Sequence, residues 1–156
     1  MRSSRGFSLI ELMVVLAVAM ILATLAIIHV LKARVLASET AAVGAVRTIL
    51  QAQTSYAATY PELGYAPSLT ALGPGSGTPT AAAAGLVDSQ LASGSRQGYT
   101  FALTASGSGG RNDAFELTAV PQAIGRTGNR GFCGDQTNVI KYSADGSTTC
   151  LYPLKQ

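Results

Sequence analysis

One acidic side chain lies inside a long apolar run near the start of this 156-residue chain. The run covers residues 7–31 and reads FSLIELMVVLAVAMILATLAIIHVL, with Glu11 its only residue that is charged at neutral pH. A carboxylate surrounded by lipid costs on the order of 3 kcal/mol even on lenient insertion scales, so an acid kept there usually has a partner. Glu11 is therefore predicted to pair with a positive group. A blander interpretation is that it complements the dipole of a helix N-terminus, one turn from Phe7.

No other group of residues predicts catalysis. The only histidine, His29, lies in the apolar run, which removes the usual Ser/His and Cys/His pairings. Asp113 and Glu116 form a local acidic pair that is expected to be solvated near a strand start, not an acid/base dyad. Glycine clusters at 73–75 and 107–110 lack the lysine and the strand-to-helix setting of a phosphate loop. The sequence predicts no enzyme and no cofactor.

The charge balance gives no reason to expect nucleic acid. Eleven basic and eight acidic side chains give a net charge of +3. Two of the arginines lie in residues 1–6, and the rest of the chain holds nine basic and eight acidic side chains. No basic stripe remains, so nucleic-acid binding is not predicted.

The apolar run is long enough to span a bilayer. As a helix, its residues would extend roughly 37 Å, more than the hydrocarbon core needs. A standard secretory signal has a shorter apolar region followed by a small-residue cleavage site, so that interpretation is poorer. Only the six residues MRSSRG precede the run. Because Lys32 and Arg34 follow it, charge alone does not fix its orientation.

The sequence RGFSLIE at residues 5–11 closely resembles the leader-peptide junction of prepilins. This junction is shared by type IV pilins, type II secretion pseudopilins and competence pilins. The resemblance implies cleavage between Gly6 and Phe7 by a membrane prepilin peptidase, which also N-methylates Phe7. It further implies that Glu11 attracts the free amino terminus of a neighbouring subunit. Other implied partners are identical or related subunits, the inner membrane and its assembly platform.

An amphipathic pattern continues the apolar run over residues 32–60. Apolar side chains recur at three- and four-residue steps, while Glu39, Arg47 and Gln51 fall between them and are expected on the solvent face. No proline occurs until Pro61, so one helix is predicted from about Phe7 to about Thr59. Most major pilins carry a glycine and a proline in the apolar half. Met20 and Ile28 stand there in this chain, which predicts a more continuous helix.

The rest of the chain predicts a small antiparallel sheet. Residues 61–97 form a connection with one short helix, for which Thr78 would be the N-cap, Pro79 the first residue and Gly94 the end. Within residues 98–156, alternating runs at 98–104, 114–120 and 137–142 predict three strands, and 130–133 a short fourth. The predicted fold class is α+β and pilin-like, with a meander of three to four strands on the helix.

Cys133 and Cys150 are the only cysteines. If the domain is exported, an even cysteine count favours a disulfide, and many type IV pilins carry one in this region. A zinc site or redox pair is disfavoured, since further ligands and a C-x-x-C spacing are absent from the sequence. Asp135 and Asp145 are too few acids to predict the calcium loop of major pseudopilins. No metal site is predicted.

Three functions stay open. The first is a subunit of a type IV pilus, and the second is a pseudopilin of a type II secretion system. The third is an exported binding domain on an uncleaved signal anchor. The first two place the precursor in the inner membrane as a single-pass protein, and the mature subunit in an extracellular pilus or a periplasmic pseudopilus. The sequence does not choose between major and minor subunits or between motility, adhesion, DNA uptake, secretion and electron transfer.

Overall fold

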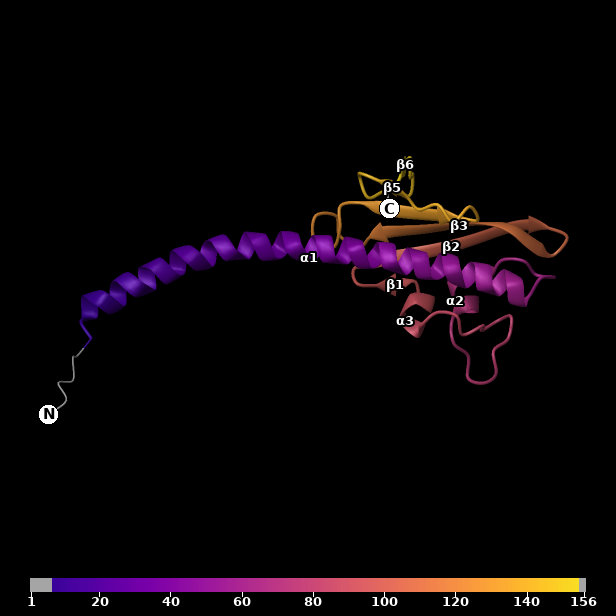
Figure 1. Cartoon of the computed structure of the whole chain (residues 1–156), viewed down its shortest axis with the longest axis horizontal. Coiled ribbons are helices and arrows are strands. Elements are labelled where there is room, and N and C mark those ends of the chain that lie inside the picture. The colour runs from indigo at the N-terminus through magenta and orange to yellow at the C-terminus, as the bar shows by residue number, and fades with distance from the viewer. Residues whose placement is uncertain (1–6, 155–156) are drawn as a thin grey trace. The chain divides into compact units, whose positions relative to one another are not determined.

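The computed structural model describes residues 7–154, and for residues 25–29 it describes the backbone only. The chain divides into two compact units, one up to Arg34 and one from Val35 onward. The first unit is helical. The second contains part of the long helix, two short helices, strands of two to eleven residues and the connecting loops (Figure 1).

Helix α1, Leu9–Thr59, contributes residues to both units. The Ser8 carbonyl accepts the first backbone hydrogen bonds, from the N–H groups of Glu11 and Leu12. The helix ends just before Pro61, which cannot donate a backbone hydrogen bond to continue it. The helix is unbroken at positions 20 and 28, where the sequence offers no glycine or proline. The prediction of one long helix is confirmed.

The sheet of the second unit is a six-stranded antiparallel meander in chain order. Its strands are β1 Ser95–Arg96, β2 Tyr99–Ser108, β3 Arg111–Pro121, β4 Gly131–Asp135, β5 Lys141–Ser143 and β6 Tyr152–Pro153. The predicted α+β class is confirmed, but the count of three to four strands was wrong. Both edge strands have only two residues, too few for an alternating pattern to be recognised.

Most of the third predicted strand, at 137–142, is irregular, and only its last two residues belong to a strand. The Asp135 carboxylate accepts hydrogen bonds from the backbone N–H and the hydroxyl of Thr137. Asn138 has a φ of 60°, in the left-handed region that asparagine tolerates better than most residues. These local contacts oppose an extended backbone, so β5 begins only at Lys141.

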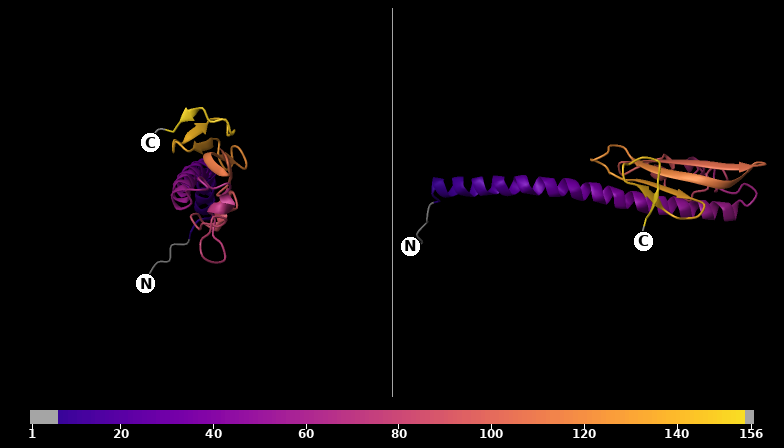
Figure 2. Two further views of the ribbon diagram at one scale, coloured as in Figure 1. Left: turned by 90° about the vertical axis from the view of Figure 1, so that its right-hand side faces the viewer. Right: turned by 90° about the horizontal axis from the view of Figure 1, so that it is seen from above.

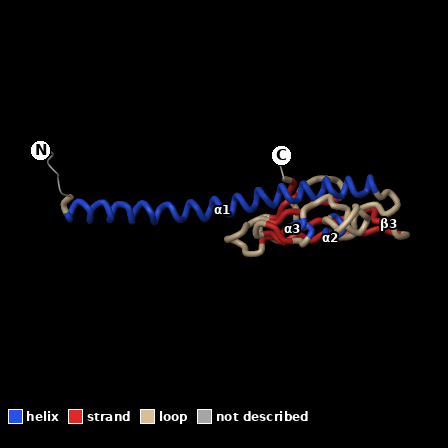
Figure 3. Tube along the Cα trace, turned by 90° about the horizontal axis from the view of Figure 1, so that it is seen from below, coloured by secondary structure: helices blue, strands red, loops and turns tan. Residues whose placement is uncertain are grey.

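The core of the second unit lies between α1 and the sheet. Figure 2 shows the longest strands running along the part of α1 that belongs to this unit, and Figure 3 shows the strands gathered on one side of it. The helix contributes Val46, Ile49 and Tyr56, all at most 1% exposed, and the sheet contributes Leu117 and Phe132. The three-to-four-residue spacing on the helix meets the two-residue spacing on the strands, as their geometries require.

Two one-turn helices, instead of one longer helix, lie in the connection at 61–97. Ser68 caps α2, Leu69–Leu72, and Asp88 caps α3, Ser89–Ala92, each by accepting a hydrogen bond from the backbone N–H three residues on. The predicted start at Thr78 and Pro79 was wrong, because the next residues form a turn closed by Thr80 and Ala83. The predicted end is confirmed, since Gly94 follows α3 with a φ of 77°.

Candidate assembly site

The predicted pairing residue Glu11 lies in the first turn of α1 with its side chain exposed. Phe7, the first described residue, is 76% exposed. Gly6, the other half of the predicted cleavage junction, lies outside the described residues. Among the ion pairs that the structure records for residues 7–154, none involves Glu11. The carboxylate is therefore available to a cation from another molecule.

Apolar side chains surround Glu11 on every face of the helix. All side chains from residue 7 to residue 24 are exposed. The large ones among them are at least half exposed, including Leu9 at 76% and Leu16 at 50%. A helix that is apolar all round is typical of one that is covered in a larger structure. Measured over the described residues, which leave out the side chains of 25–29, no helix is long and apolar enough to cross a membrane.

Glu39 is buried, so the prediction that placed it on the solvent face of the helix was wrong. It is only 5% exposed, and its two carboxylate oxygens divide between two donors. One accepts the backbone N–H of Asn129 at 2.8 Å, and the other accepts the Arg130 guanidinium at 2.7 Å and 2.8 Å. These charge-assisted contacts join α1 to the segment just before β4. Sequence spacing gave no signal for them, because the partners lie about ninety residues apart.

The same region holds a buried tyrosine. Tyr99 is fully buried, and its hydroxyl donates to the Arg130 carbonyl at 2.8 Å. Burial, helped by the negative charge of Glu39 and opposed by Arg130, raises the pKa of Tyr99 to about 12. The Arg130 guanidinium also lies about 6 Å from the rings of Phe132 and Tyr142. Arg130 thus connects the helix, the sheet and an aromatic cluster.

A buried amide connects α1 to the loop that follows it. Gln53 has no exposed surface, and its side chain both donates to the Ala66 carbonyl and accepts the Ala66 N–H. Within the described residues no buried side-chain nitrogen or oxygen lacks a hydrogen-bond partner. The second unit therefore satisfies its own buried polar groups.

A disulfide closes the C-terminal part of the sheet. Cys133 in β4 is bonded to Cys150, seventeen residues later, with 6.0 Å between the two Cα atoms. The bond encloses β5 and the turn after it. The disulfide that the cysteine count favoured is thus present in the structure.

The acids near this disulfide make local contacts. Burial opposes ionisation of Asp135, but hydrogen bonds from Thr137 and Lys141 outweigh it and hold the pKa of that carboxyl below its ordinary value. Asp145 accepts the backbone N–H of Ser147. In the described part of the chain, no three acidic, histidine or cysteine side chains form a group that could hold a metal ion.

The acidic pair Asp113 and Glu116 is not brought together. Asp113 lies where the pairing of β3 with β2 shifts register, whereas Glu116 lies three positions on, in the regular ladder opposite Thr104. Asp113 forms an exposed ion pair with Arg111 at 3.3 Å, and Glu116 lines a hollow that also contains Lys141. The two carboxyls thus have different neighbours.

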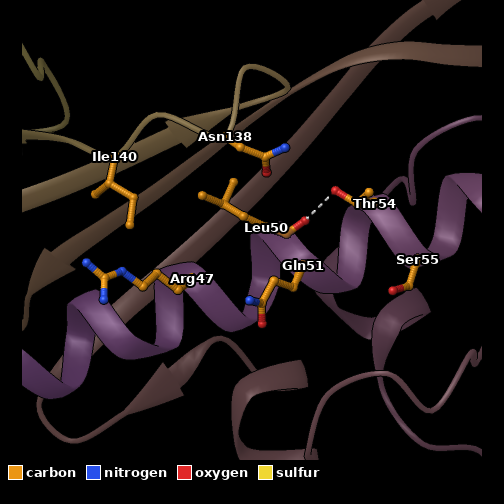
Figure 4. A pocket seen from close by; sticks show the side chains of 7 residues that line it. All are labelled: Arg47, Leu50, Gln51, Thr54, Ser55, Asn138 and Ile140. Carbon is orange, nitrogen blue, oxygen red and sulfur yellow. Dashed lines mark hydrogen bonds between the residues drawn. The ribbon is translucent and has the colours of Figure 1, made fainter. Parts of the chain in front are cut away.

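A hollow with a volume of about 580 Å³ lies beside the second half of α1. Figure 4 shows Arg47, Gln51 and Ser55 along the helix and Asn138 and Ile140 facing them from the segment before β5. The Thr54 hydroxyl donates to the Leu50 carbonyl, so its oxygen can still accept a hydrogen bond. No sequence motif predicts a role for this hollow.

Comparison with known proteins adds one decisive observation. Residues 1–27 match the family model described as the prokaryotic N-terminal methylation motif. The chain carries a prepilin leader signature. The matched residues include the predicted junction of Gly6 and Phe7 and the acid Glu11. No curated protein and no solved structure gave a significant match.

The match supports a type IV pilin-like or pseudopilin precursor. A leader of this kind is typical of a membrane-anchored precursor whose mature chain assembles in the periplasm or outside the cell. Proteins with this signature serve as structural subunits, processed and assembled with related chains. The exposed apolar helix and the unpaired Glu11 of the described structure are consistent with this kind of protein.

Proposed function

We propose that this prepilin is the precursor of a type IV pilus-like filament subunit. Prepilin peptidase cuts after Gly6 and methylates the new N-terminus at Phe7. The mature chain then polymerises through its apolar helix with identical or related subunits. The observation that carries the proposal is the leader match at residues 1–27, which joins the junction to an acid within an apolar helix.

The cut has an electrostatic consequence. Before cleavage, Phe7 is linked by a neutral peptide bond, and cleavage creates a cationic amine at the end of the apolar segment. A single N-methyl group leaves that amine able to carry a positive charge. Glu11 of an incoming subunit then pairs with this amine on its neighbour. In an apolar environment the attraction between two opposite charges is stronger than in water, so the pair sets the axial register of the subunits.

The apolar segment supports both stages of the subunit's life. In the precursor, residues 7–31 anchor the chain in the inner membrane with the leader in the cytoplasm. In the filament, the same side chains are covered by the apolar segments of other subunits. Transfer from lipid to a protein interior exchanges one apolar environment for another, so packing and the Glu11 pair must favour assembly. An inner-membrane assembly platform extracts the subunits.

Intact mass spectrometry of the chain from its own cells tests the processing step. The expected mass is that of residues 7–156 plus one methyl group, with Cys133 and Cys150 oxidised. Deletion of the prepilin peptidase should restore the mass of the whole precursor. An unprocessed chain in peptidase-positive cells would instead support the exported binding domain on an uncleaved anchor, and would reject the filament proposal.

Glu11→Gln tests the pairing step with little change in shape. Processing and membrane insertion should persist, while filaments fall by at least tenfold because the neighbour's amine loses its counter-ion in an apolar environment. Ser8→Ala, one turn away in sequence but without a charge, serves as the matched control. Glu11→Gln filaments at wild-type abundance, counted by electron microscopy, would refute the pairing.

A pseudopilin of a type II secretion system is the second candidate. The observation that favours it is the unbroken helix at Met20 and Ile28, positions at which most major pilins carry helix-breaking residues. Deletion of the gene separates the two candidates. Loss of surface filaments with normal secretion supports the pilus, whereas retention of secreted enzymes in the periplasm supports the pseudopilus.

A further inference from the structure

Two hollows follow one flank of α1 in the second unit and share Arg47. The first is the hollow of about 580 Å³ that reaches Ser55, and the second, of about 410 Å³, begins at Glu39. Ile140 and Leu154 lie on the side away from the helix. We call the two together the flank groove. From Glu39 to Ser55 it extends roughly 24 Å along the helix, enough to contact an element of another protein and not only a small ligand.

The groove face of the helix contains a glycine that the subunit itself does not require. Gly44 is exposed in the middle of α1, and outside the adjacent helix backbone no atom lies within 4 Å of the position that a Cβ would occupy. A glycine inside a helix costs about 1 kcal/mol relative to alanine. Close approach of a second chain to the backbone at Gly44 would account for the missing side chain.

Arg47, where the two hollows meet, has an unsatisfied charge. Four other basic residues form ion pairs within the second unit, namely Arg96, Arg111, Arg130 and Lys141. Arg47 is exposed and belongs to none of the ion pairs recorded for the described residues. The other groove residues are neutral, apart from Glu39 and Arg130, which bind each other. The groove therefore favours an anionic group.

Two exposed acids of the second unit, Glu116 and Glu62, belong to no ion pair recorded for the described residues. Most of its other acids have a partner in the same chain: ion pairs hold Asp88, Asp113, Asp135 and Glu39, and the Ser147 N–H binds Asp145. Glu116 shares a hollow with Lys141. Glu62 is exposed, belongs to no ion pair recorded for the described residues, and sits in a turn in which the N–H groups of Leu63 and Gly64 donate to the Tyr60 carbonyl.

We propose that the flank groove is a docking surface for a second copy of this chain, whose Glu62 pairs with Arg47. The second copy approaches the helix closely at Gly44, and its turn at Glu62 enters the hollow between Gln51 and Asn138. The inference rests on the proposed function, because a filament places copies of the subunit side by side. It adds a contact that lies outside the apolar segment and does not involve Glu11.

Photo-crosslinking in cells that express the full chain tests the occupant. A photoreactive phenylalanine analogue replaces Gln51 in the groove or, as a matched control, Gln90, an exposed glutamine on α3. The Gln51 position should give an adduct of twice the subunit mass, in which mass spectrometry finds the peptide containing Glu62. Adducts formed only with other proteins, or with a copy through peptides that never include the turn at Glu62, overturn the proposal.

Charge reversal tests the pair. Arg47→Glu and Glu62→Arg should each lower the yield of the copy–copy adduct roughly fivefold, the upper range for an exposed ion pair, and the double variant should restore it. Arg126→Glu makes the same charge change at an exposed arginine outside the groove and should change nothing. Thermal unfolding in detergent confirms that each variant is folded. Single reversals without effect, or a double variant without rescue, also overturn the proposal.

The two proposals fail separately. A processed wild-type chain that forms filaments but gives no Gln51 adduct rejects the flank groove and leaves the filament function intact. The opposite result is a chain that never forms filaments but gives a Gln51 adduct, which the single charge reversals weaken and the double variant restores. This result supports the flank groove and rejects the filament proposal.

Discussion

The two acids Glu11 and Glu39 both lie on α1, and they show how differently the two units of this chain are stabilised. Glu39 is buried, and its oxygens bind Asn129 and Arg130 of the same unit. Glu11 is exposed among apolar side chains and forms no recorded ion pair in the described chain. One carboxylate completes a fold, and the other is left for a partner. One part of a helix can thus belong to a domain that satisfies its own buried polar groups, while another part exposes apolar surface and an acid for binding to another chain.

The same contrast holds for leucines, and a matched pair of truncations should give the largest difference. Leu117 in β3 is fully buried, whereas Leu12 in the first unit is 55% exposed. Leu117→Ala should lower the free energy of unfolding of the second unit by about 3 kcal/mol, because it removes buried surface and leaves a cavity. Leu12→Ala should leave that free energy unchanged within about 0.5 kcal/mol.

Thermal unfolding of the full chain in detergent, followed through the tyrosine signal of the second unit, measures both values. Filament abundance should fall in Leu12→Ala, although its second unit is as stable as in the wild-type chain, because the change removes apolar surface from the assembly segment. Equal destabilisation by the two variants would contradict this contrast between a buried and an exposed leucine.

The disulfide is a second internal constraint of the C-terminal region. Replacing both Cys133 and Cys150 with serine removes a crosslink over seventeen residues, which should cost about 3 kcal/mol, mostly through a freer unfolded chain. Unfolding with and without reductant measures this cost. The wild-type chain should lose stability in reductant, whereas the double serine variant should not. Cleavage after Gly6 should be equal in both, because the junction belongs to the other unit.

Features that depend on neighbouring residues were predictable from the sequence, whereas contacts between residues far apart in the sequence were not. The leader motif, the long helix and the main strands are local patterns, and each was readable from neighbouring residues. The burial of Glu39 was not, because Arg130 lies about ninety residues away and the spacing around Glu39 alone indicated solvent. The Asp135–Thr137 hydrogen bonds and the left-handed Asn138 likewise shortened a strand that the alternation had predicted. In the first unit, the helix followed from a continuous apolar run, which is likewise a local signal.

A charge-removing change at each acid directly compares the two carboxylates. Glu39→Gln should destabilise the second unit by about 2 kcal/mol, since it leaves Arg130 without its counter-ion; the partial exposure of that guanidinium limits the loss. Glu11→Gln should not change the unfolding of this unit at all. If Glu39→Gln proved neutral in unfolding but abolished filaments, Glu39 would belong with Glu11 as an assembly residue.

The smallest expected effect concerns Tyr99, whose hydroxyl depends on the same contacts as Glu39. Its pKa is raised to about 12, from an ordinary value of 10.0. A raised pKa means that the folded state holds the proton more tightly than the unfolded state. The stability from the neutral phenol is therefore complete below pH 10 and is lost as the pH rises toward 12.

Tyr99→Phe separates this contribution from those of the other tyrosines. At pH 8 the variant should lose about 1 kcal/mol, the value of the hydrogen bond to the Arg130 carbonyl. Between pH 10 and 12 the wild-type chain should lose stability more steeply than the variant, so the difference between them should shrink. Unfolding by denaturant at a series of pH values gives both curves. A constant difference across that range would show that Tyr99 ionises equally easily in both states, and that the cluster around Arg130 is open to water.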